Sequence, residues 1–142
     1  MKKVFFATVF LGGILASCNS SIPTEANPQS LNGTWELNYI GLTRLEAKDL
    51  YPNKKPAITF NTTENKVNGN TGCNSFFGSL KSVDAHKIQF DQLGMTKMFC
   101  EGDGEKIFTE NLNKVETWSI TDKGKTLHLT TKDFDLMRFT KK

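Results

Sequence analysis

The sequence predicts a mainly β domain, a small antiparallel sheet curled into a lipocalin-like barrel of about eight strands with one α-helix packed against it. Short runs of alternating apolar and polar residues recur roughly every 8 to 12 residues, with turn residues between them. The connections are too short for the crossovers that parallel strands require. Only one stretch, Gly104 to Val115, repeats apolar residues at helical spacing. The chain of 142 residues, 37% of them hydrophobic, suffices for one core but not for two domains.

The first 17 residues have the organisation of a signal peptide. Two lysines follow Met1, an almost unbroken apolar run spans residues 4–14, and small residues follow it. Together with the small residues that follow it, the apolar run covers about 14 residues before Asn19, whereas a membrane-spanning helix requires about 20. We therefore expect a secretory signal rather than a transmembrane helix.

Leu15-Ala16-Ser17-Cys18 resembles the lipobox of bacterial lipoproteins. The resemblance implies cleavage before Cys18 and lipid attachment at its sulfur. At about 0.8 kcal/mol per buried methylene, two or more acyl chains would hold such a protein on a membrane. Asn19 rather than Asp follows the cysteine, which under the enterobacterial sorting rule indicates the outer membrane of the bacterial cell envelope. Residues 18–30 contain two prolines and little apolar surface, so we expect a flexible tether.

The folded domain is expected over residues 31–142. In its first strand Trp35, Leu37 and Tyr39 alternate with polar residues, and Trp35 is expected in the core. Residues 41–55 lose this alternation and predict an irregular connection, in which three leucines could support a short helical turn. Further strands are predicted at residues 57–60, 66–69, 76–81, 87–91, 117–121, 127–130 and 134–139.

The predicted helix starts at a plausible cap, Asp103, and ends near Val115. Phe108, Leu112 and Val115 follow one another at i, i+4 and i+7. We expect this apolar stripe to cover the sheet or barrel, although a partner-binding face is the alternative.

A glycine-rich and asparagine-rich stretch, residues 67–78, surrounds the first cysteine of the folded domain. Its residue types suit a backbone held in left-handed or closely packed positions. We interpret it as a structural corner in which Gly69, Gly72 or Asn74 has a positive φ and Gly78 permits a kink in the sheet. A phosphate-binding loop is the less favoured interpretation, because the Walker pattern ends in Gly-Lys-Ser/Thr before a helix.

Cys73 and Cys100 are the two cysteines of the folded domain. An exported protein meets an oxidising compartment, which favours a structural disulfide between them over two buried thiols or a metal or redox site. The bridge would stabilise the fold by roughly 3 to 4 kcal/mol in the chain-entropy model. A metal site needs more ligands, since His86 and His128 stand alone in the sequence. Neither histidine is marked as a catalytic base, and His128 is expected on a solvated face.

The charge balance does not favour nucleic acid as a partner. The formal charge of the whole chain is +3, and removal of the two signal-peptide lysines leaves 16 Lys and Arg against 15 Asp and Glu. We expect no cofactor, no metal and no nucleic acid, with the membrane contacted through the N-terminal lipid.

Several segments together resemble the META domain (HslJ-like) family: Gly69 to Gly78, Met95 to Cys100, Leu31 to Trp35, and Leu127 to Leu129. The resemblance implies a barrel-like domain with one helix, commonly exported and often lipidated, linked to stress resistance, including novobiocin tolerance, without an established enzymatic activity. We therefore expect a non-enzymatic envelope lipoprotein that acts through protein contacts. The alternative is a binding module for a lipid or other apolar small molecule, held between the helix and the open side of the barrel.

Overall fold

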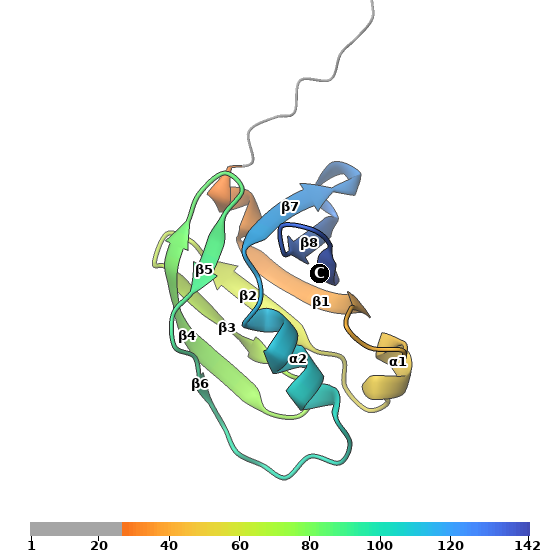
Figure 1. Cartoon of the computed structure of the whole chain (residues 1–142). Helices are drawn as coiled ribbons and strands as arrows, with labels where there is room; N and C mark the ends of the chain where they lie inside the picture. The colour runs from red at the N-terminus through yellow and green to blue at the C-terminus, as the bar shows by residue number, and fades with distance from the viewer. Residues whose placement is uncertain (1–26) are drawn as a thin grey trace, which may run out of the picture.

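A computed structural model describes residues 27–142 of the protein (Figure 1). The expected signal peptide, Cys18 and most of the expected tether lie outside these residues. The first element is the 3-10 helix η1 (Pro28–Leu31), which begins within the last residues assigned to the tether. Its cap is Asn27, whose side-chain oxygen accepts a hydrogen bond from the Gln29 N–H at 3.0 Å. Within the described residues, no helix has the length and apolar character to cross a membrane.

All strand pairings in the sheet are antiparallel, as predicted. The strands run in the order β5-β4-β3-β2-β1-β9-β8-β7, and β6 pairs with β4 outside this order. Their bounds are β1 (Gly33–Ile40), β2 (Ala57–Asn61), β3 (Lys66–Asn70), β4 (Ser75–Val83), β5 (Ile88–Phe90), β6 (Gly94–Met95), β7 (Thr117–Thr121), β8 (Thr126–Thr130) and β9 (Asp135–Lys141). Between β7 and β8 the chain makes the short 3-10 turn η2 (Asp122–Gly124).

The sheet curls until its two edge strands meet, so that it forms a nearly closed barrel. Lys87 and Thr117 form an isolated antiparallel bridge between these edges. Beside it, the Ile88 N–H donates to the Glu116 carbonyl at 3.1 Å, and the Trp118 N–H donates to the His86 carbonyl at 2.9 Å. The helix α2 (Gly104–Leu112) lies across the part of this side that the bridge leaves open (Figure 1). The structure therefore confirms the predicted fold class.

Trp35 belongs to the core and is fully buried, as predicted. Its indole N–H donates to the Leu31 carbonyl at 2.7 Å, which satisfies the one polar group of the side chain. The Lys141 ammonium lies 4.6 Å from the centre of the Trp35 ring, close enough for a cation–π contact. The helix contributes Phe108, which is also fully buried and packs against Phe76 with ring centres 5.9 Å apart. The helix thus covers the barrel, as predicted.

The helix is shorter than its apolar pattern suggests. It ends at Leu112, because the chain then turns through bonds from the Lys114 N–H to the Asn111 carbonyl and from the Val115 N–H to the Leu112 carbonyl. Val115, the last residue of the apolar pattern, is nevertheless buried, although it lies in the turn after the helix. Asp103 occupies the N-cap position, but its side chain makes no capping hydrogen bond.

Two short elements complete the fold. The irregular connection contains one helical turn, α1 (Ala47–Leu50), as its leucines allowed. The two-residue strand β6 pairs with β4 through Phe76 opposite Met95 and Phe77 opposite Gly94. The sequence did not predict β6, because two residues are too few to show alternation.

Candidate functional site at the disulfide corner

The glycine-rich stretch forms the turn between β3 and β4. Asn70 pairs with Ser75, which leaves a four-residue loop from Thr71 to Asn74. The Thr71 N–H donates to the Asn74 carbonyl at 2.8 Å, and the Asn74 N–H donates to the Thr71 hydroxyl at 3.0 Å. Gly72 has a φ of 95°, a conformation that favours glycine. The prediction that Gly69, Gly72 or Asn74 has a positive φ is thus confirmed at Gly72.

Gly69 is required for space rather than for a left-handed backbone, whereas at Gly78 a larger residue would displace the end of a flexible side chain. A Cβ at Gly69 would lie 2.1 Å from the Ala57 carbonyl oxygen and 2.7 Å from the Phe76 ring. A Cβ at Gly78 would lie 2.6 Å from the Leu93 side chain. The register shift of β4 against β5 lies further along the strand, between Leu80 and Ser82, and a kink at Gly78 itself stays a prediction.

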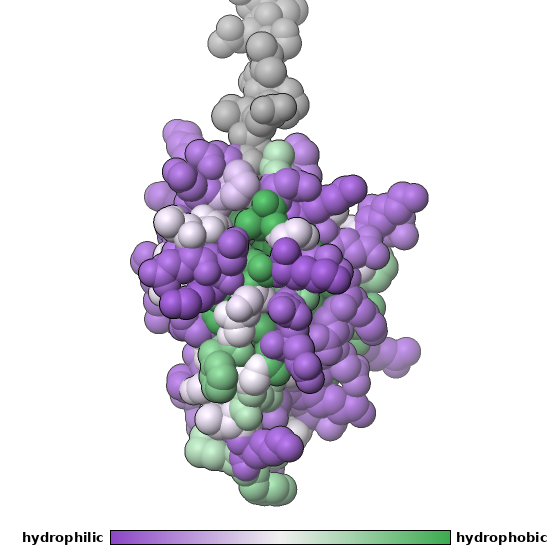
Figure 2. Space-filling model, turned by 90° about the vertical axis from the view of Figure 1, so that its left-hand side faces the viewer, coloured by the Kyte–Doolittle hydropathy of each residue, from purple (hydrophilic) through white to green (hydrophobic). Residues whose placement is uncertain are grey.

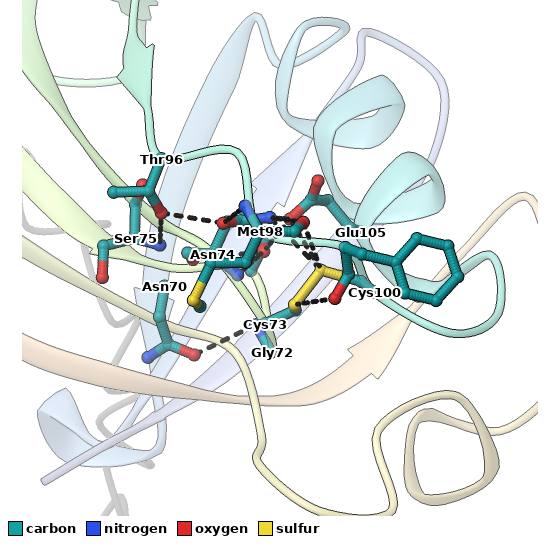
Figure 3. The surroundings of a disulfide bond; sticks show 11 residues. Asn70, Gly72, Cys73, Asn74, Ser75, Thr96, Met98, Cys100 and Glu105 are labelled. Carbon is teal, nitrogen blue, oxygen red and sulfur yellow. Dashed lines mark hydrogen bonds between the residues drawn. A yellow bond between two sulfur atoms is a disulfide. The ribbon is translucent and has the colours of Figure 1, made fainter.

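The side chain of Asn74 makes hydrogen bonds to several segments that meet at the corner. Its side chain is fully buried, and its oxygen accepts hydrogen bonds from the Thr96 hydroxyl and the Met98 N–H, both at 2.8 Å (Figure 3). Its amide nitrogen donates to the Met98 carbonyl at 3.0 Å and to Glu105 Oε2 at 2.8 Å. One side chain therefore ties the β3–β4 turn to the β6–α2 loop (residues 96–103) and to the first turn of α2.

The disulfide between Cys73 and Cys100 joins the same turn to the β6–α2 loop. This confirms the pairing that the compartment argument favoured. The two sulfurs and a Glu105 carboxylate oxygen lie within 4.8 Å of one another, a cluster that could be taken for a metal site. The disulfide leaves both cysteines without a thiolate, however, so the oxidised site lacks the ligands that a thiolate-bound metal requires.

Glu105 is held by neutral donors. Its Oε2 accepts from the Thr71 hydroxyl at 2.8 Å as well as from the Asn74 amide. Its position in the first turn of α2 also favours a negative charge, because the helix dipole is positive there. The carboxylate thus serves as an acceptor that fixes the β3–β4 turn against the helix.

Tyr51 fixes the connection that follows α1 to the same corner. The ring packs against two glycines: a Cβ would lie 2.6 Å from it at Gly72 and 2.8 Å from it at Gly104. Its hydroxyl donates to the Gly104 carbonyl at 2.7 Å. Burial raises the pKa of Tyr51, so the hydroxyl keeps its proton and its role as a donor.

A cleft of about 540 Å³ opens beside the disulfide, and we call it the corner cleft. It lies between the α1 segment (residues 45–54), the β3–β4 turn and residues 99–105. Its lining includes the apolar side chains Leu45, Leu50 and Phe99 and the carboxylates Asp49, Glu101, Asp103 and Glu105. Phe99 is 94% exposed and its neighbour Met98 is 61% exposed, although the loop that carries them is held by Asn74 and the disulfide.

Comparison with known proteins identifies the family. A model of the META domain matches residues 29–142. The chain belongs to the META domain family. No match was found among functionally curated proteins.

Solved structures share the META domain fold at low sequence identity. An NMR structure of a protein from Burkholderia xenovorans is 19% identical, with a TM-score of 0.62 over 100% of this chain and 99% of that one. A second NMR structure is 18% identical, with a TM-score of 0.55 over 78% of this chain and 89% of that one. A crystal structure of a DUF4847 family protein from Bacteroides vulgatus ATCC 8482 is 15% identical, with a TM-score of 0.51 over 78% and 92%. These similarities concern the fold alone.

The META domain has a second cavity, of about 340 Å³, between α2 and the segment that carries β6. We call it the helix cavity. Its lining includes the apolar side chains Phe76, Leu93, Met95, Phe108 and Leu112, with Asp91, Gln92, Thr109 and Asn113 at polar positions.

Figure 2 shows the β4–β6 side of the molecule, where a hydrophobic band runs between hydrophilic residues. Phe77, 60% exposed on the outer side of β4, is one of the residues that leave apolar surface uncovered.

The two histidines of the META domain lie in separate surroundings. His86 is in the β4–β5 turn, where the Lys87 and His86 N–H groups donate to Asp84 Oδ1 at 2.8 and 3.1 Å. These two bonds hold the pKa of Asp84 below its usual value. His128 is half-buried rather than fully solvated, with Nδ1 3.1 Å from Asp135 Oδ2.

His128 also lies beside a hydroxyl group, since its Nε2 is 3.0 Å from Thr121 Oγ1. A hydroxyl, a histidine and the carboxylate of Asp135 in this order resemble the start of a nucleophilic site. Thr121 is exposed, its hydroxyl is also 3.4 Å from Asp122 Oδ2, and neither the corner cleft nor the helix cavity includes these residues. We interpret the three side chains as a cross-strand hydrogen-bond chain on β7, β8 and β9.

Proposed function

We propose that the protein is a non-enzymatic lipoprotein of the bacterial cell envelope, anchored in the outer membrane, whose META domain supports envelope integrity or tolerance of stress and antibiotics through protein contacts. The lipobox-like segment ending at Cys18 supports the anchor. Cys18→Ala should therefore leave an unlipidated precursor that no longer fractionates with the membrane. Normal processing and membrane fractionation of this variant would contradict the anchoring part of the proposal.

The observation that carries the proposed contact role is the rigid presentation of Phe99. An exposed aromatic side chain costs little conformational entropy on binding when its backbone is already held in place. The Asn74 side chain donates to the Met98 carbonyl and accepts from the Met98 N–H, and the disulfide holds Cys100 on the other side of Phe99. The β6–α2 loop lies at the end of the molecule away from η1, which is the side where the chain enters the domain (Figure 1). A partner bound there would not compete with the anchor for space.

The test is site-specific photocrosslinking in the lipidated, full-length protein in its own envelope. A photoreactive phenylalanine analogue at Phe99 should form an adduct with one defined envelope protein. The control position is Thr63, which is exposed in the β2–β3 turn at the η1 end. No adduct at Phe99, or the same set of adducts from both positions, would contradict a specific contact at the corner.

The helix cavity favours a second candidate function, the binding of a lipid or other apolar small molecule. Its volume of about 340 Å³ falls at the lower end of the roughly 300–1,000 Å³ range of small-molecule sites. Native mass spectrometry of the delipidated domain, purified from its own envelope, separates the two functions. A stoichiometric apolar ligand would support the binding module, whereas a ligand-free domain together with the Phe99 adduct would support protein contacts.

A further inference from the structure

We propose that the corner cleft binds a basic, apolar peptide segment of the partner protein, an inference that rests on the proposed role in protein contacts. The cleft offers an exposed aromatic side chain, Phe99, beside the aliphatic side chains Leu45 and Leu50. Leu45 is itself 55% exposed. Apolar residues of a partner would find a concave, partly apolar surface here rather than a flat one.

The negative charge of the cleft favours a partner segment that carries positive charge. Of the charged residues that line it, four are acidic and one, Lys54, is basic. Glu105 is satisfied by Thr71 and Asn74, so it contributes to the field without needing a partner. The carboxylates of Asp49, Glu101 and Asp103 are the free ones, since none of them forms an ion pair with another residue of the described chain.

This concentration of acidic groups contrasts with the rest of the protein. The chain without its expected signal peptide has nearly balanced charges, with 16 Lys and Arg against 15 Asp and Glu. Complementary charge therefore favours a segment in which Lys or Arg flanks an apolar residue that contacts Phe99. The same carboxylates disfavour an anionic membrane surface as the occupant, because like charges would face each other.

The test measures the affinity of defined peptides for the lipidated, full-length protein in nanodiscs of phosphatidylcholine, with empty nanodiscs as the blank. One labelled peptide alternates Lys with apolar residues, a second replaces each Lys with Glu, and a third replaces each apolar residue with Ser. Only the first should bind, and its fluorescence anisotropy should rise with the protein concentration.

Two triple variants with the same change in net charge separate the effect of the cleft carboxylates from the effect of the protein's net charge. Asp49→Asn, Glu101→Gln and Asp103→Asn remove the free carboxylates of the cleft. The substitution at Asp103 removes no capping bond, because its side chain makes none. The control variant, Glu110→Gln with Glu116→Gln and Asp133→Asn, changes exposed residues that do not line the cleft.

The cleft variant should weaken the first peptide about tenfold at low salt, a change of about 1.4 kcal/mol in binding free energy shared among three exposed charge pairs. The control variant should weaken it less than about twofold, and the difference should shrink in high salt, which screens exposed charges. Phe99→Ser should weaken the same peptide at every salt concentration.

The inference would be overturned if the two triple variants weakened the first peptide equally or if the Glu peptide bound. It would also be overturned if the first peptide bound empty nanodiscs as well as it bound the protein. If the Phe99 photocrosslink persists while the peptides show no charge dependence, the peptide chemistry is wrong and the contact role stands. If no photocrosslink forms at Phe99, the contact role itself is wrong.

Discussion

Replacing Asn74 with aspartate preserves the size of the side chain but converts its donor end into an acceptor. The two bonds that the Asn74 oxygen accepts, from Thr96 and from the Met98 N–H, can persist in the variant. The donor end now faces Glu105 Oε2 at 2.8 Å and the Met98 carbonyl at 3.0 Å. Asn74→Asp therefore places a second carboxylate against the first in a buried position.

The cost at neutral pH follows from two effects. Two charges whose centres are about 4 Å apart repel by about 4 kcal/mol at an effective dielectric constant of about 20. Loss of a hydrogen bond to a charged group costs a further 1.5–3 kcal/mol or so. These effects sum to about 6 kcal/mol when both carboxyl groups are charged. Protonation of one of them, at about 1.4 kcal/mol per pH unit above about 4, limits the loss in the free energy of unfolding at pH 7 to about 4 kcal/mol, against a typical total of about 5–15 kcal/mol.

The penalty should depend on pH with a definite sign. A neighbouring like charge raises the pKa of one carboxyl group of the pair, so the folded variant binds a proton more tightly than the unfolded chain. The penalty is therefore absent below the unfolded pKa, which is about 4, and grows as the pH rises towards the raised folded value. Asn74→Ala lacks this second carboxylate, so its penalty should depend much less on pH.

The assay is urea unfolding of the disulfide-intact protein, followed by tryptophan fluorescence at about pH 7 and about pH 4. Each variant is compared with the wild type at the same pH, which removes the titration of unrelated groups. Adding Glu105→Gln to Asn74→Asp should recover part of the loss, because the new amide can donate to the new carboxylate. A cost below about 1 kcal/mol, or one that is the same at both pH values, would refute the role of Asn74 as a buried donor to Glu105.

Three further predictions concern the stability of the same fold. Cys73→Ser with Cys100→Ser should lower the free energy of unfolding by about 3 to 4 kcal/mol, measured by urea unfolding, because the bridge closes a sequence separation of 27 residues; an unchanged urea midpoint would contradict it. Gly69→Ala should cost at least about 3 kcal/mol through overlap with the backbone, whereas Gly102→Ala, which has a φ of 82° but an open surrounding, should cost only about 1 kcal/mol. Asp84→Asn should be less stable than the wild type above about pH 4, and the difference should vanish as the pH falls through the lowered folded pKa of Asp84; a constant difference would exclude the charged form as the cause.

The strands and the helix could be predicted because each shows a periodic pattern over several residues. Trp35 alternates with polar neighbours and lies in the core, and Phe108 and Leu112 face the barrel from one helix. The short strand β6 and the helix end at Leu112 could not be predicted, because they depend on pairing with β4 and on local turn bonds. Alternation carries no information about which distant segment completes a ladder.

Some residues of the candidate site could be predicted from the sequence and others could not. Gly72 was predicted from its type, since a four-residue turn needs a positive φ that glycine adopts without strain. Gly69 was selected as well, but the space that it leaves for the Phe76 ring is visible only when β3 and β4 are paired. The role of Glu105 was missed altogether, because a single acidic residue at a helix start is common and carries no signal of its own.

The amino-acid sequence by itself determined that this chain has one mainly β domain, that Cys73 and Cys100 are its candidate disulfide, and that residues 69–78 form a specialised corner. These properties depend on local conformational preference and on composition, which the order of residues contains directly. Only the tertiary structure decided that Asn74 holds three segments together, that Gly78 makes room for Leu93, and that Phe99 stands exposed beside an acidic cleft. The contacts of Asn74 and of Gly78 join residues more than ten positions apart in the chain, and the cleft beside Phe99 forms only when the distant α1 segment packs against residues 99–105. Only folding brings such segments together.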